Sequence, residues 1–175
     1  MPTQNWPGTV SSPTGIGIGG SVSGVGGIAF PAIQVAVADV NTLDDYEEGN
    51  WTAAYVCGTS GTITISASTG HYTKNGRQVI VNGYFDVSAI DAPVGSLTIT
   101  GLPFTIADIT NQFPAISIRA DGLAATAVTS LQGRGQKNTA NILVQKFSAG
   151  AAAALAADIT TGTDIQISLA YNAAT

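Results

Sequence analysis

The stretch that decides the fold is His71-Tyr-Thr-Lys-Asn-Gly-Arg-Gln-Val-Ile-Val-Asn-Gly-Tyr-Phe-Asp-Val-Ser88. Asn75-Gly76 is a pair that adopts positive φ easily, as a tight hairpin turn requires, so the chain is expected to reverse direction there. Beyond the turn, apolar and polar side chains alternate, which is the period of a strand with one buried face. The face predicted to be core consists of Val79, Val81, Gly83, Phe85 and Val87. The opposite face carries Ile80 and Tyr84, so we expect a neighbour to cover part of it.

Strand patterns recur on both sides of this hairpin. Further strands are predicted near residues 53–57, 62–66, 97–100, 116–119, 123–130, 140–147 and 165–171. Residues 149–158 contain a run of alanines, but a segment this short is a marginal helix, so a turn or two is expected at most. Many short strands without an amphipathic helix predict an all-β fold, an antiparallel β-sandwich, with a jelly roll favoured over an immunoglobulin-like order. The strand order itself cannot be read from the sequence.

Composition narrows the function. The chain has 175 residues, of which 10% are charged, against roughly 25% in an ordinary soluble domain. Much of its surface must therefore be covered by small polar side chains or by another protein. The formal net charge is −5 and the six basic residues are scattered, which argues against nucleic-acid binding. The single cysteine, Cys57, excludes an intrachain disulfide and is expected to pack as a small hydrophobe.

Residues 1–38 contain no charged side chain. Their prolines oppose helix, and their many glycines raise the entropy that ordering costs. We therefore predict two parts, an extended N-terminal docking arm over residues 1–38 and the β-sandwich domain over residues 39–175. The side chains expected to dock on a partner's surface, as an added extended segment, are Ile16, Ile18, Val22, Val25, Ile28 and Phe30.

Other interpretations of the arm are weaker. A signal peptide needs basic residues ahead of its apolar core, and a membrane span would be broken by dense glycine and by Pro31. Gly15-Ile-Gly-Ile-Gly-Gly20 matches the G-x-G-x-x-G pattern, but no strand precedes it and Pro31 lies where the helix should run. Neither a membrane nor a dinucleotide cofactor is expected.

Four carboxylates gather at the junction between arm and body, at Asp44, Asp45, Glu47 and Glu48. They do not follow the calcium-loop spacing, and they lie too close together to flank a sugar as a glycosidase pair does. A solvated or partner-facing turn is the preferred interpretation. The single histidine, His71, is expected to be a surface or structural residue, and no nucleophile or phosphate-loop motif occurs. We expect no enzyme, and no catalytic, cofactor or metal site.

The same junction resembles a known module. Thr42-Leu-Asp-Asp-Tyr-Glu-Glu-Gly-Asn-Trp-Thr52, with Gly70-His-Tyr-Thr-Lys-Asn-Gly76 and Gly101-Leu-Pro-Phe104, is similar to a module of tailed-bacteriophage virion proteins, namely tail-fibre tips and head fibres or capsid decoration proteins. The resemblance covers about residues 28–175 and implies a β-sandwich that assembles as a homotrimer. The module motif maps to Leu43, Asp44, Asp45, Tyr46, Glu47, Glu48, Gly49 and Trp51, and Asn50 departs from the common pattern. Trp51 is expected to pin the first strand to the core.

The resemblance implies a non-enzymatic phage virion structural protein. The favoured form is a trimeric capsid decoration or cement protein on the outer capsid surface, whose arm binds the major capsid protein and whose residues 120–157 can supply the trimer interface. The alternative is a tail-fibre or receptor-binding tip in the virion tail, which holds a host surface glycan against Trp51, Tyr72 or Tyr84.

Overall fold

The computed structural model describes residues 45–124, 130–148, 151–153 and 155–174, together with the two-residue strands β1 (Ile16–Gly17) and β2 (Ile28–Ala29). The chain divides into two compact units, Met1–Tyr46 and Glu47–Thr175. In the first unit, β1 and β2 pair in parallel. The boundary predicted between residues 38 and 39 lies outside the described residues.

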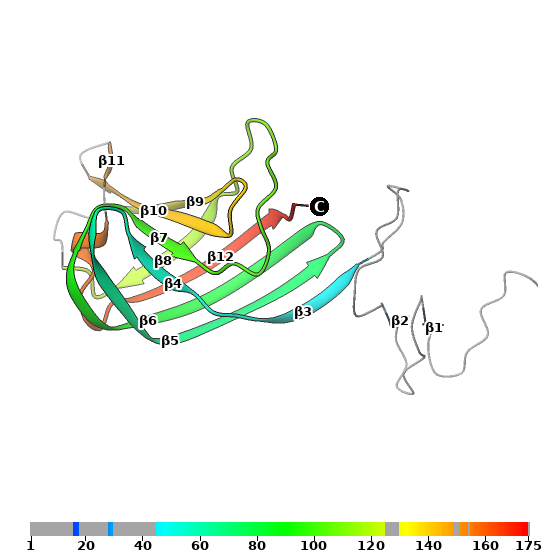
Figure 1. Ribbon diagram of the computed structural model, residues 1–175, viewed down its shortest axis with the longest axis horizontal. Helices are drawn as coiled ribbons and strands as arrows, with labels where there is room; N and C mark the ends of the chain where they lie inside the picture. The colour runs from blue at the N-terminus through cyan, green and yellow to red at the C-terminus, as the bar shows by residue number, and fades with distance from the viewer. Residues whose placement is uncertain are drawn as a thin grey trace, which may run out of the picture. The chain divides into compact units, whose positions relative to one another are not determined.

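The second unit consists of two antiparallel sheets (Figure 1). The remaining strands are β3 (Tyr46–Trp51), β4 (Ala54–Cys57), β5 (Ser60–Asn75), β6 (Gln78–Val94), β7 (Leu97–Thr100), β8 (Ile116–Asp121), β9 (Ser130–Gln136), β10 (Asn141–Ser148), β11 (Ala151–Ala153) and β12 (Asp164–Asn172). Sheet 1 has the order β3-β5-β6-β12-β8, and sheet 2 has the order β11-β10-β7-β4, with β9 also pairing with β10. The predicted all-β sandwich is confirmed, and the strand order is the part that the sequence left open.

The core lies between the two sheets. Its fully buried members include Val79, Val81, Phe85 and Ile165 from sheet 1, and Leu97, Ile99, Ile142 and Val144 from sheet 2. Phe85 contacts Trp51 edge to face, with ring centroids 5.4 Å apart, and contacts Tyr55 of sheet 2 at 6.1 Å. The face predicted for residues 79–87 is therefore the core face.

Trp51 holds β3 against the core, as expected. Its side chain is 5% exposed, and its indole Nε1–H donates to the backbone oxygen of Asn82 at 3.2 Å. Gly70 on β5 makes room for the indole, since a Cβ at this position would lie 2.5 Å from Trp51 Nε1. Cys57 packs half-buried against the core, and burial raises the pKa of its thiol.

The hairpin between β5 and β6 is confirmed, but its turn is not the predicted one. Asn75 pairs with Gln78, so the two-residue loop is Gly76-Arg77 and not Asn75-Gly76. Gly76 has φ 57°, whereas Asn75 and Arg77 have negative φ. This is the pattern of a II′ turn, which needs positive φ only at its first central residue. Asn75 is therefore the last residue of β5 and not part of the turn.

We predict that Gly76→Ala lowers the free energy of unfolding by about 1–2 kcal/mol, because a side chain is strained in the left-handed conformation. Asn75→Ala should change it by no more than about 0.5 kcal/mol, as for an ordinary surface position. Urea unfolding of the two variants beside the parent protein tests this. Equal losses in both variants would indicate an Asn-Gly turn instead.

Residues 123–130 were predicted to form a strand. Of the residues described there, the prediction is wrong at 123–124, which are not strand, and holds only at Ser130, where β9 begins. Strand β9 contains Gly133 and Gly135, and glycine has a low intrinsic preference for strand. Both are needed for packing, since a Cβ on either glycine would lie 2.5 Å from an isoleucine Cδ1, that of Ile116 or Ile106. Strand β9 therefore forms because it pairs with β10 and packs closely on the two isoleucines, and not because its residues have a high intrinsic preference for strand.

In its described residues the alanine run makes no more than the turn or two of helix that was expected, but it also contains a strand that was not predicted. Ala151–Ala153 forms β11, antiparallel to β10, and only Ala156–Asp158 makes one 3₁₀ turn, η1. The helix preference of alanine amounts to a few tenths of a kcal/mol per residue over most other residues, so backbone pairing with an available strand outweighs it in a short segment.

Candidate ligand-binding site

A gap opens at the edge of sheet 1 where β12 loses its partner. Strand β12 pairs with β8 only as far as Leu169, which lies opposite Ile116. The next contact on this side is an isolated bridge between Ala173 and Ile106. Ala107 still donates its N–H to the Asn172 oxygen at 2.8 Å, and residues 108–115 then leave the sheet as a loop.

The loop leaves for local reasons. Pro114 has no N–H to donate to a ladder, and Ala115 forms its bridge with Arg134 of β9, which belongs to sheet 2. Asn111 adopts φ 59°, a left-handed conformation that asparagine tolerates better than most residues. The chain therefore crosses from one sheet to the other at this point and leaves space beside β12.

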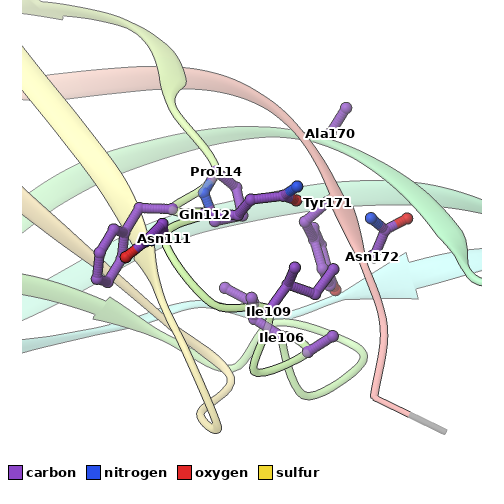
Figure 2. Close-up of a pocket in the computed structure, with 10 residues that line it drawn as sticks. Ile106, Ile109, Asn111, Gln112, Pro114, Ala170, Tyr171 and Asn172 are labelled. Atoms are coloured by element: carbon purple, nitrogen blue, oxygen red, sulfur yellow. The ribbon is translucent and has the colours of Figure 1, made fainter.

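That space is a hollow of about 380 Å³ between the loop and the end of β12 (Figure 2). Three of its lining residues carry side-chain amides, Asn111 and Gln112 on the loop and Asn172 on β12. Figure 2 shows the Gln112 amide directed toward β12. None of the 10 lining residues is acidic, basic or histidine.

Tyr171, which also lines the hollow, remains neutral. Its hydroxyl donates to the backbone oxygen of Phe104 at 3.1 Å, and burial raises the pKa of its phenol. The inner wall of the hollow is therefore uncharged at any physiological pH.

The rim of the hollow carries an exposed aromatic ring. Phe113 is 50% exposed, with the guanidinium carbon of Arg134 4.7 Å and the ammonium of Lys137 5.3 Å from its ring centroid. Cation–π contacts of this kind contribute about 0.5–1 kcal/mol at exposed sites. They help to fix the orientation of the ring at the rim.

A polar cluster ties the loop to the turn between β9 and β10. Lys137 forms an ion pair with Asp108 at 2.7 Å and donates to the backbone oxygen of Ile109 at 2.9 Å. The side-chain amide of Asn138 donates to Asp108 at 3.0 Å. Hydrogen bonds from Lys137 and then Asn138 hold the pKa of the Asp108 carboxyl below its ordinary value. This cluster anchors one end of the loop, and the bridge between Ala115 and Arg134 anchors the other, so the hollow is preformed.

Such a hollow is suited to binding and not to acid–base chemistry. Amides donate and accept hydrogen bonds at once, as the hydroxyls of a sugar do, and the Phe113 ring offers an apolar face. A concave wall with few convergent polar groups is the usual form of a small-ligand site.

A second hollow, of about 320 Å³, lies on the outer face of sheet 1 over β3, β5 and β6. It brings Glu48 and Gly49 of the module motif together with His71. His71 is exposed, within the surface or structural role predicted for it, and its Nδ1 lies 2.7 Å from the amide oxygen of Asn50.

The remaining predicted residues are only partly described. Of the arm residues, Ile16 lies opposite Ile28 in the β1–β2 pair. The arm positions Ile18, Val22, Val25 and Phe30 and the motif positions Leu43 and Asp44 lie outside the described residues. Asp45 and Tyr46 end the first unit. The acidic turn predicted here is wrong in its described part, because Asp45 is buried and both Glu47 and Glu48 lie in β3. Glu47 begins the second unit and accepts a hydrogen bond from the Tyr72 hydroxyl at 3.4 Å.

The three aromatic residues suggested for glycan contact do not form one site. Trp51 is buried, and Tyr72 packs edge to face on Phe104 at 5.4 Å. Tyr84 is exposed on the outer face of sheet 1. Phe113 was not among the predicted site residues, although Asn111-Gln-Phe-Pro114 does signal it, as an aromatic residue beside amides in a segment without strand alternation.

Within the described parts of the chain, no three His, Cys, Asp or Glu side chains are grouped so that they could hold a metal ion. In the same parts, no helix is long and apolar enough to cross a membrane.

Comparison with known proteins gives a likeness in fold. No protein-family model matches the sequence, and no curated protein matches it. The fold is similar to the crystal structure of the Dettilon tailspike protein (gp208), with a TM-score of 0.66 and 18% sequence identity. The match covers 90% of this chain and 31% of that chain, so this chain spans about a third of the tailspike's length. At this identity the likeness shows the fold alone.

Proposed function

We propose that this protein is a structural component of a tailed-bacteriophage virion. The observation that carries the proposal is the fold likeness to a phage tailspike over 90% of the chain. The module motif around Trp51, which resembles phage virion proteins, supports it independently. In this role the protein acts with copies of itself, and a homotrimer is the assembly that the resemblance implies.

Within the virion, we place the protein in the tail, as part of a spike or fibre tip that binds a host surface glycan. The hollow beside β12 supports this position, because amide-bearing residues and the exposed Phe113 ring line it, and such groups suit the hydroxyls and apolar faces of a saccharide.

The proposed action is binding without catalysis. Glycoside hydrolysis needs an acid and a second carboxylate on opposite sides of the scissile bond, and the hollow is lined by neither Asp nor Glu. Asp108, which lies near the rim, is engaged by Lys137 and Asn138.

A capsid decoration or cement protein is the second candidate. It is favoured by the uncharged arm of residues 1–38, which suits an extended segment laid along the major capsid protein. The sandwich would then stand on the outer capsid surface.

The number of copies in each virion separates the two positions. We predict a handful of copies relative to the major capsid protein, measured by quantitative mass spectrometry of purified virions. Hundreds of copies would overturn the tail position in favour of capsid decoration, and absence from purified virions would overturn both.

A further inference from the structure

The hollow beside β12 has an uncharged wall and a cationic rim, and this combination constrains its ligand. We propose that it selects saccharides that carry an anionic group, a carboxylate or a phosphate, and that Arg134 receives this group. The inference rests on the proposed saccharide binding and names the class of saccharide.

Arg134 differs from Arg119, Lys137 and Lys146 in how its charge is used. Arg119 lies 2.9 Å from Asp121, and Lys137 and Lys146 each have an aspartate partner. No carboxylate in the described part of the chain forms an ion pair with Arg134. Its guanidinium has an aromatic ring as its neighbour, which leaves the N–H groups at the edge of its plane available.

The position of Arg134 is set by the backbone that forms the hollow. Arg134 pairs with Ala115, and the next residue, Gly135, donates its N–H to the Pro114 oxygen at 2.8 Å. Its guanidinium carbon is 4.7 Å from the centroid of Phe113, which itself lines the hollow. A ligand that touches the exposed Phe113 ring is therefore close to the guanidinium.

The geometry of a guanidinium suits this task. Its planar fork can form two parallel hydrogen bonds to a carboxylate or phosphate while its face rests on an aromatic ring. Lys137, in contrast, is committed to Asp108 at 2.7 Å and to the loop backbone. Lys137 thus positions the loop, and Arg134 is the cation that can bind the anionic group of the ligand.

Because the protein carries a net negative charge, binding of an anionic ligand requires a cation at the site. The formal net charge is −5, so the molecule as a whole repels an anion, and Asp108 lies near the rim. Because Lys137 compensates the charge of Asp108, the positive electrostatic potential at the rim comes from Arg134. Screening by salt should therefore weaken binding of an anionic ligand more than binding of a neutral one.

The test uses the full-length protein and an array of matched oligosaccharide pairs. In one arm, each pair contains a uronic acid or the corresponding neutral hexose. In the other arm, each pair is phosphorylated or dephosphorylated. We expect the anionic member of at least one type of pair to bind about tenfold more tightly, as a charge-assisted hydrogen bond implies. The two arms distinguish carboxylate from phosphate.

Arg134→Gln should abolish this preference and retain binding of the neutral member, which also shows that the hollow is intact. Arg119→Gln is the matched control, because it removes the same charge from β8 at a residue that is already paired with Asp121. Equal affinity for both members, or a preference that survives Arg134→Gln, would overturn the inference while the proposed function stands. Binding of no oligosaccharide of either kind would overturn saccharide binding as well.

Discussion

Phe85→Ala is expected to lower the free energy of unfolding by about 3–5 kcal/mol, the range for deleting a buried phenylalanine side chain. Phe85 is fully buried and contacts Trp51 of sheet 1 and Tyr55 of sheet 2. It also fills the space over Gly83, where a Cβ would lie 2.3 Å from its Cζ. The walls of the resulting cavity are aromatic rings and paired strands, which cannot collapse into it, so a loss in the upper half of the range is expected.

The matched control is Phe113→Ala, which removes the same atoms from a half-exposed position. It forfeits some cation–π contact and little burial, so a loss of at most about 1 kcal/mol is expected. Guanidinium unfolding followed by intrinsic fluorescence measures both variants against the parent protein. A Phe85→Ala variant no less stable than Phe113→Ala would show that the two sheets do not depend on this ring.

Phe85 also illustrates which part of the fold could be predicted. Strand β6 was found because its side chains alternate, and alternation follows directly from the strand period and from burial of one face. The burial of Trp51 was expected from its place in the module motif and not from alternation. The predicted hairpin has its turn one residue later than expected, since an Asn-Gly pair fits more than one register and the pairing of Asn75 with Gln78 decides between them.

The strands that were missed have no local signal. Strand β9 contains two glycines, and β11 is three alanines, so intrinsic preference argues against both. They exist because β10 offers a hydrogen-bonding edge on each side. The candidate site was missed for a related reason. Asn172 and Phe113 are far apart in sequence and come together only because β8 stops pairing at Ile116.

The ion pair between Lys146 and Asp158 was equally hidden from the sequence, and it is the second position where a large effect is expected. Lys146 lies on β10 and Asp158 ends η1, and their side chains are 21% and 10% exposed. The ammonium donates to the carboxylate, while the backbone oxygen of Asp158 accepts from Ala124 N–H at 2.8 Å. This pair fastens η1 to sheet 2.

Lys146→Met keeps the length and packing of the side chain but leaves the Asp158 carboxylate in a largely dry environment without its cation. We expect a loss of about 2–4 kcal/mol, somewhat below the range for a fully buried pair because water reaches Lys146 in part. Asp158→Asn should be less harmful, since the flexible lysine can extend its ammonium toward solvent.

The double variant Lys146→Met/Asp158→Asn separates the cost of an unpaired charge from the value of the pair. If the loss arises from stranding the carboxylate, the double variant should be more stable than Lys146→Met alone, because no buried charge remains. Additive losses would contradict this account. The exposed pair of Arg119 and Asp121, with side chains 57% and 68% accessible, is the internal reference. Removing Arg119 should cost less than about 1 kcal/mol, since solvent already screens that pair.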